Sequence, residues 1–195
     1  AHPTILAAAK LCGVDEVYQV GGAQAIAALA YGTEAIPACD IVVGPGNRYV
    51  TEAKRQVAGD VVIDSPAGPS EVLVLADEGS SPRLCALELV CQAEHDPDAA
   101  VALVTTSREL LTRVRSSLRT EVARAPRRRI VEEALARQGA LLLADTREEA
   151  LAFARDYAAE HLALFTANPH ADLDAVPTAG TVFLGEAAAV AYGDY

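Results

Sequence analysis

The chain has 195 residues, of which 51% are hydrophobic and 22% charged, and its formal net charge is −11. This amount of apolar sequence is enough for one or two compact units with buried cores. The acidic balance argues against nucleic acid as a partner, because phosphate binding needs a basic surface. No apolar run approaches the length of a membrane span and no signal-peptide pattern opens the chain, so we expect a cytoplasmic protein without a membrane partner.

The four cysteines, Cys12, Cys39, Cys85 and Cys91, lie within or beside apolar segments and form no C-x-x-C pair. We therefore expect reduced, buried thiols. The chain also contains no methionine and stops at Tyr195 without a polar tail. These two features favour a segment cut from a longer protein.

The first part of the chain predicts short strands joined to helices by glycine turns. We expect helices over residues 3–11, 23–31 and 49–57, and strands over residues 16–20, 40–43 and 61–64. Gly21-Gly22 connects a strand to a helix, which is the plan of a nucleotide-binding unit with backbone N–H groups available for an anion. The full G-x-G-x-x-G pattern is absent, so a tight turn that needs glycine is the alternative.

Two further loops are rich in glycine and proline. Gly44-Pro45-Gly46-Asn47 follows a strand, and residues 65–71 separate two more strands. Asn47 is placed to cap the next helix. Contact with a cofactor is the second possibility for Asn47, because loops after strands are where α/β sheets bind ligands.

From Glu71 onward the pattern predicts a second parallel sheet. We expect strands over residues 72–76, 100–105, 140–144, 162–165 and 181–184, and helices starting at Ser81 and over residues 108–124, 127–138 and 147–157. Alternating strands and helices indicate a doubly wound unit. We therefore predict an α/β fold of two incomplete, Rossmann-like parallel-sheet units.

Two pairs of polar residues stand at predicted element ends. Gln92 and His95 are three residues apart near the end of the Ser81 helix, a spacing that places both on one face where a zinc ion could use them. The alternative is a solvated helix end, where the dipole favours histidine. Glu160-His161 lies between a helix and a strand, where it could supply a base and a proton relay or be an ordinary surface pair.

Six stretches, taken together and in order, resemble histidinol dehydrogenase. They are Gly21-Gly22-Ala23-Gln24-Ala25, Gly44-Pro45-Gly46-Asn47, Thr51-Glu52-Ala53-Lys54, Ala67-Gly68-Pro69-Ser70-Glu71, Gln92-Ala93-Glu94-His95 and Glu160-His161. The resemblance implies a zinc enzyme that oxidises L-histidinol to L-histidine through histidinaldehyde with two NAD, the last steps of histidine biosynthesis. It also implies a second domain, residues 72–182, inserted into a first that comprises residues 1–71 and 183–195.

The resemblance also assigns roles to residues. Gln92, His95 and Asp194 match zinc ligands that also hold the substrate, and Ser70 matches a substrate-contacting serine. His161 matches the family's proton-accepting histidine, and the resemblance implies that it also contacts the substrate.

Glu160 matches the acid that activates water, and Gln24 and Asn47 match positions that contact NAD.

The family chain is roughly twice as long, and a further zinc ligand is expected from the partner subunit of a homodimer with a shared active site. Two alternatives stay open: a catalytically incompetent α/β fragment that folds or self-associates without zinc, and an ordinary zinc-free NAD dehydrogenase. The missing G-x-G-x-x-G argues against the second.

Overall fold

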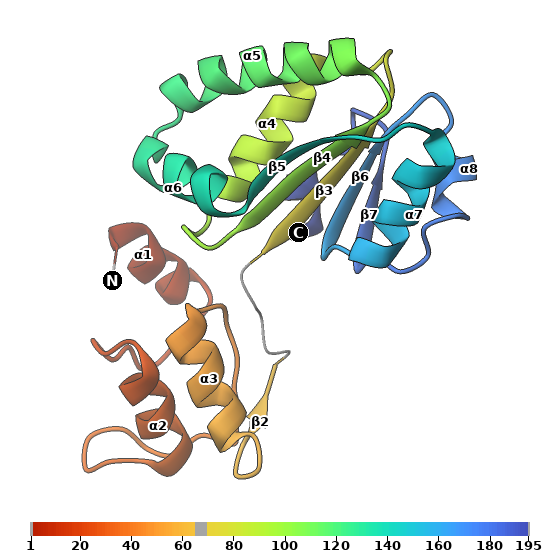
Figure 1. Cartoon of the computed structure of the whole chain (residues 1–195). Coiled ribbons are helices and arrows are strands. Elements are labelled where there is room, and N and C mark those ends of the chain that lie inside the picture. The colour runs from red at the N-terminus through yellow and green to blue at the C-terminus, as the bar shows by residue number, and fades with distance from the viewer. Residues whose placement is uncertain (1, 65–69, 195) are drawn as a thin grey trace. The chain divides into compact units, whose positions relative to one another are not determined.

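The computed structural model describes residues 2–64 and 70–194, with the side chains of residues 193 and 194 outside the description (Figure 1). It divides into two compact units, Ala1–Gly68 and Pro69–Tyr195. The insertion of residues 72–182 into a first domain, and the return of residues 183–195 to it, stay predictions. Most of the predicted Gly/Pro loop at residues 65–71 lies outside the described residues.

The first unit has helices α1 (Pro3–Leu11), α2 (Ala23–Tyr31) and α3 (Arg48–Val57), and strands β1 (Ile41–Val42) and β2 (Val62–Ile63). The two strands pair in parallel, with Ile41 opposite Val62. A small core of Ile26, Ala30, Val42 and Val57 lies between the strands and the helices α2 and α3.

The strand predicted over residues 16–20 is wrong, because residues 14–20 adopt no regular structure. Val17 is 57% exposed, and among the described residues no strand pairs with this segment. An isolated strand leaves its backbone groups without partners, so the alternating sequence alone is not enough to form one.

The second unit contains a five-stranded parallel sheet. Its strands are β3 (Glu71–Ala76), β4 (Ala100–Thr105), β5 (Gly139–Leu143), β6 (His161–Phe165) and β7 (Thr181–Leu184). In space they follow the order β5-β4-β3-β6-β7. The chain therefore builds outward from β3 in one direction and then returns to its other side, which confirms the predicted doubly wound α/β fold.

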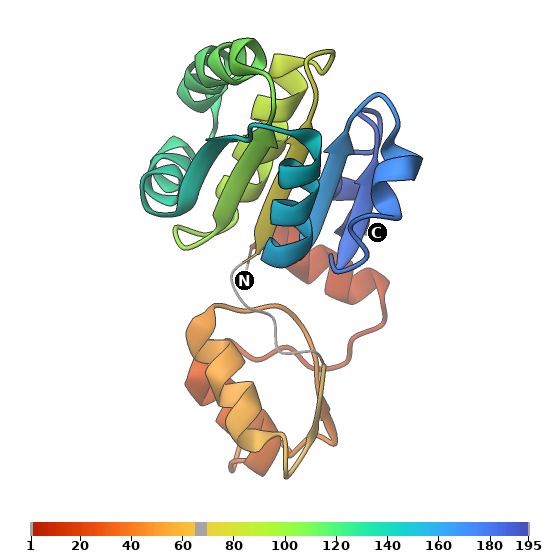
Figure 2. The same cartoon turned by 45° about the vertical axis from the view of Figure 1, so that its right-hand side comes forward.

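Helices cover both faces of this sheet (Figures 1 and 2). One face carries α4 (Pro82–Ala93), α5 (Arg108–Arg124) and α6 (Arg128–Gln138), and the other carries α7 (Arg147–Tyr157) and α8 (Pro169–Leu173). Val72 and Val74 of β3 pack in the α4 layer, and Leu73 and Leu75 pack in the α7 layer. A strand buried on both sides reads as a continuous apolar run, which is how β3 appears in the sequence.

The predicted N-cap at Ser81 is confirmed, and Thr146 caps α7 in the same way. The Ser81 side chain accepts a hydrogen bond from the Leu84 N–H, and Thr146 does the same for Glu149 N. Helix α8 is not predicted by the sequence pattern, because it has only five residues. The short 3₁₀ helix η1 (Val190–Asp194) was also missed.

The thiols differ from the prediction. Cys85 is buried, but Cys12 and Cys91 are exposed. Cys12 is the C-cap residue of α1, a helix with no buried residue among those described, which agrees with the exposure of its thiol. Among the described residues, no helix is long and apolar enough to cross a bilayer.

Candidate active site

Gln92 and His161 meet at one edge of the second sheet. His161 opens β6, where it pairs with Val72 of β3 and Thr181 of β7. Its Nδ1 atom lies 3.3 Å from Oε1 of Gln92, and its ring packs edge-on against Phe183 with 5.8 Å between the centroids. The half-buried imidazole is therefore held between a helix and a strand.

The two residues of the predicted zinc pair have different surroundings. Gln92 is only 4% exposed, so a solvated helix end is the wrong description of this side chain. A proline stops a helix at the residue before it, but helix α4 already ends at Ala93, well before Pro97. His95 therefore lies outside the helix, just beyond the C-cap residue Glu94. The His95 side chain is exposed, and its backbone N–H donates a hydrogen bond to the backbone carbonyl of Gln92.

Ser70 and Glu160 lie at the same edge of the sheet. The Glu160 carboxylate accepts a hydrogen bond of 3.1 Å from the N–H of Glu71, the residue after Ser70. The Glu160 carbonyl accepts another from Thr181 N, at 2.8 Å. The side chain of Glu160 is exposed, so its acid group faces water while its backbone is fixed.

The topology explains why these residues gather. β3 and β6 are neighbours, so Ser70-Glu71 and Glu160-His161 lie side by side where both strands begin. A helix that connects two parallel strands runs back across the sheet, so the end of α4 returns to that same edge. The site is therefore at the amino-terminal edge of the sheet.

The segment that leads to Asp194 is attached to α4. The Ser81 N–H donates to the Glu186 carboxylate, and the Val190 N–H donates to Glu88 Oε2 at 3.3 Å. Glu88 is buried, and this burial raises the pKa of its carboxyl group although the Val190 N–H acts in the opposite sense. Glu88 precedes Gln92 by one helical turn, so η1 starts beside the part of α4 that carries Gln92. The Asp194 side chain lies outside the described residues.

Gln24 and Asn47 both lie at helix starts in the first unit. The Asn47 side chain accepts hydrogen bonds from Tyr49 N at 3.1 Å and Val50 N at 3.2 Å, so the predicted cap is confirmed. Gln24 is exposed in the first turn of α2. Gly22, which caps that helix, has φ +77° and is therefore the position where the turn needs glycine.

A buried lysine holds the loop before Asn47. Lys54 of α3 is only 4% exposed; it forms an ion pair with Asp64 and donates to the Gly44 carbonyl at 2.5 Å. Asp64 also accepts a 2.7 Å hydrogen bond from the Gly44 N–H. The Lys54 ammonium, and then the Gly44 N–H, lower the pKa of Asp64. The sequence showed Lys54 only within a family motif, because an ordinary lysine is expected at the surface.

Among the described residues, no three His, Cys, Asp or Glu side chains gather closely enough to hold a metal ion. Any metal at this edge would depend on Gln92, which is an amide, on His95, and on side chains outside the description.

Known proteins are similar to this chain over essentially its whole length. A family model described as histidinol dehydrogenase matches residues 1–195. The chain is 50% identical over 191 residues to a histidinol dehydrogenase of Methanothermobacter thermautotrophicus, which covers 98% of the chain and 45% of that relative. It is 51% identical over 195 residues to one of Xanthomonas axonopodis pv. citri, again 45% of the relative's length.

A crystal structure of histidinol dehydrogenase from Elizabethkingia anophelis is similar in fold, with a TM-score of 0.89 and 41% identity over 99% of this chain. The chain covers 45% of that structure. It therefore spans about half the length of the relatives it matches.

Proposed function

Because the chain belongs to the histidinol dehydrogenase family, we propose that the whole protein oxidises L-histidinol to L-histidine through histidinaldehyde, with two NAD, in histidine biosynthesis. The observation that carries the proposal is the meeting of Gln92 with His161 beside Ser70 and Glu160. These are the residues to which the family resemblance assigns substrate and proton handling.

We propose zinc as the metal, with Gln92, His95 and Asp194 as ligands from this chain. The chemistry of the donors fits in part: an amide oxygen, an imidazole and a carboxylate are oxygen and nitrogen ligands that zinc accepts. The attachment of η1 to Glu88 supports the inclusion of Asp194. Bound zinc would hold the amino alcohol by its amine and imidazole and keep it oriented between the two oxidations.

His161 is the proposed base for both oxidations. With Gln92 Oε1 as acceptor, Nδ1 of His161 carries the proton and Nε2 is the basic nitrogen. In the first oxidation His161 would take the hydroxyl proton, and in the second, once it has given that proton up, it would take a proton from the aldehyde hydrate. Bound NAD would supply the hydride acceptor for each of the two oxidations.

Glu160 is the proposed activator of the water that hydrates the aldehyde. Its exposed carboxylate has one oxygen fixed by Glu71 N–H, which orients the group without removing it from water. Water gives a proton to Glu160 as its oxygen adds to the carbonyl carbon, and His161 gives the proton from the first oxidation to the carbonyl oxygen, which completes the hydrate and restores His161 as a base. Ser70, next to Glu71, is proposed to contact the substrate at this edge.

Gln24 and Asn47 are proposed to contact NAD. The Lys54–Asp64–Gly44 network supports this role for Asn47, because it fixes the loop from which Asn47 projects. The whole protein is proposed to be a cytoplasmic homodimer whose partner subunit completes the zinc site.

The test is zinc content by elemental analysis of the intact protein, followed by NADH absorbance after addition of L-histidinol and NAD. We expect bound zinc and NADH formation that a chelator removes. If the protein contains no zinc and shows no turnover, the result would support the incompetent fragment instead. Turnover unaffected by chelation would support a zinc-free dehydrogenase.

A further inference from the structure

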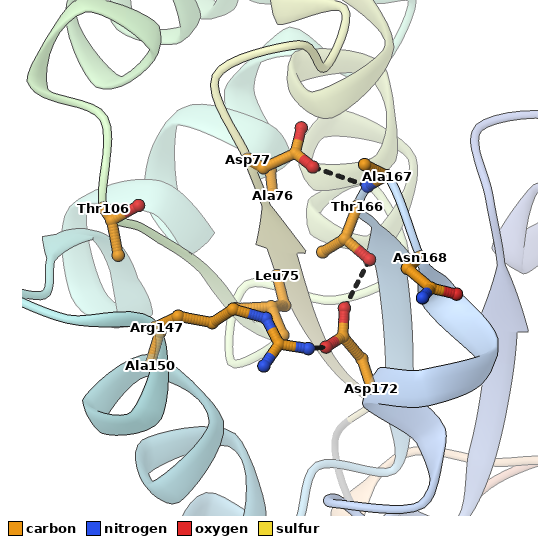
Figure 3. A pocket seen from close by; sticks show the side chains of 10 residues that line it. All are labelled: Leu75, Ala76, Asp77, Thr106, Arg147, Ala150, Thr166, Ala167, Asn168 and Asp172. Atoms are coloured by element: carbon orange, nitrogen blue, oxygen red, sulfur yellow. Dashed lines mark hydrogen bonds and ion pairs between the residues drawn. The ribbon is translucent and has the colours of Figure 1, made fainter.

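A second cavity lies at the opposite, carboxyl-terminal edge of the five-stranded sheet (Figure 3). Its volume is about 240 Å³, and residues at the ends of β3, β4 and β6 line it together with α7 and α8. β3 and β6 are the neighbours at which the strand order reverses. Open parallel sheets bind ligands in the crevice outside the carboxyl ends of such strands. The chemistry proposed above uses the other edge, so this crevice has no assigned role.

One wall of the cavity carries a fixed guanidinium. Asp172 is 1% exposed, and its two oxygens accept from Arg147 and from the Thr166 hydroxyl. The Arg147 side chain is 56% exposed and reaches over the cavity from the start of α7. A guanidinium has five N–H donors, and a single Asp172 oxygen cannot accept from all of them. Its planar shape matches that of a carboxylate. Arg147 is therefore held ready to bind a second carboxylate.

Another wall carries the Asp77 carboxylate. Among the described residues, only neutral groups donate hydrogen bonds to it. Asp77 accepts hydrogen bonds from Gly79 N at 3.1 Å, from the Ser80 hydroxyl at 3.3 Å and from Ala167 N. These bonds orient the Asp77 carboxylate and leave its negative charge in place. Glu78 lines an adjoining hollow that shares Asp77 with the cavity. This side of the cavity therefore favours an ammonium group.

The remaining surface is mostly apolar. Leu75, Ala76 and Ala150 line the cavity together with the charged side chains. A phosphorylated ligand does not suit the cavity, because the negative charges of Asp77 and Asp172 outnumber the positive charge of Arg147. We propose that this cavity binds a free α-amino acid with an apolar side chain, its carboxylate on Arg147, its ammonium on Asp77 and its side chain on Leu75, Ala76 and Ala150.

The test is calorimetric titration of the intact protein with L-leucine, in the presence of saturating L-histidinol to occupy the proposed active site. N-acetyl-L-leucine lacks the ammonium and L-leucinamide lacks the carboxylate, so each should bind at least about tenfold more weakly than L-leucine. Equal binding of the three compounds, or no binding of L-leucine at millimolar concentration, would overturn the proposal.

Two variants locate the binding. Ala150→Leu fills the cavity without removing a charge, and Arg147→Met removes the guanidinium; both should abolish L-leucine binding. The matched controls are Ala152→Leu and Arg155→Met on the same helix, at positions that do not line the cavity. They should bind L-leucine as the unchanged protein does. Retained binding in Ala150→Leu would place the amino acid elsewhere and contradict the assignment, whatever the outcome for histidinol oxidation.

Discussion

The imidazole Nδ1 of His161 lies 3.3 Å from the amide Oε1 of Gln92, although 69 positions separate the two residues in the chain. Gln92 is buried and belongs to α4, whereas His161 begins β6. One amide is thus both a proposed metal ligand and the hydrogen-bond partner of the proposed base. Its replacement should affect zinc binding and proton transfer together.

Gln92→Leu keeps the approximate volume of the side chain and removes its oxygen. Because the site is buried and Leu is apolar, we expect the free energy of unfolding to change by no more than about 1–2 kcal/mol. Zinc affinity should fall roughly 100-fold or more, since the variant loses a proposed direct ligand. Chelator competition measures the zinc affinity and urea denaturation the stability. Cys91→Ala, at the exposed neighbouring position, is the control that should change neither.

His161→Asn tests the role of the base without removing a proposed metal ligand. Removal of a general base typically lowers turnover by about 10²–10⁴-fold, so NADH formation from L-histidinol should fall in that range. Zinc content should stay at the level of the unchanged protein, because His161 is not among the proposed ligands. Normal turnover by this variant would show that His161 is not the base.

The amino-acid sequence predicts the second unit better than the first, and the reason is burial. β3 and β4 are continuous apolar runs because both their faces are covered, so their limits are visible in the sequence. The segment 16–20 alternates like a strand, but no described strand pairs with it. Pairing depends on distant segments, which a local pattern does not contain.

The candidate site shows the same division. Local spacing identifies Gln92 with His95 and Glu160 with His161, but only the strand order brings these pairs to one edge. The burial of Lys54 and the cavity beside Arg147 were not predicted either, because each depends on contacts with remote residues: Lys54 with Gly44 and Asp64, Arg147 with Asp172.

Lys54→Met should loosen the loop that carries Asn47. The variant removes the hydrogen bond to the Gly44 carbonyl and leaves Asp64 without its ammonium partner. We expect the melting temperature to fall by about 5 °C and the KM for NAD to rise while kcat changes little. Lys10→Met, on the exposed helix α1, is the control. An unchanged KM for NAD would argue against a role for this loop in cofactor binding.

The same ion pair predicts a dependence on acid. The pKa of Asp64 is lowered in the folded protein, by Lys54 and then by the Gly44 N–H, so its ionised form stabilises the fold. This contribution is complete above the ordinary aspartate pKa of about 3.9 and is lost as the pH falls through the lowered value. The stability difference between the unchanged protein and Asp64→Asn should therefore shrink below about pH 4, as urea denaturation at several pH values would measure.

Glu88 is expected to act on zinc through the backbone of η1. Glu88→Gln keeps an oxygen that can accept from Val190 N, whereas Glu88→Leu has no acceptor. Glu88→Leu should weaken zinc binding by about 10–100-fold, the usual effect of losing a group that orients a ligand, and Glu88→Gln should not. Equal zinc affinity in the two variants would show that this hydrogen bond does not position Asp194.

The stability of the Glu88→Gln variant should also depend on pH. Burial raises the pKa of Glu88, so the charged carboxylate destabilises the folded state. The protonated acid contributes stability that is complete below the unfolded pKa of about 4.3 and is lost as the pH rises through the folded value. Glu88→Gln has no charge to bury, so it should be more stable than the unchanged protein at about pH 7, and the difference should disappear toward about pH 4. Urea denaturation at the two pH values measures it. Glu94→Gln, at the C-cap of the same helix, is the control for the substitution itself, because the Glu94 side chain is half-buried rather than buried.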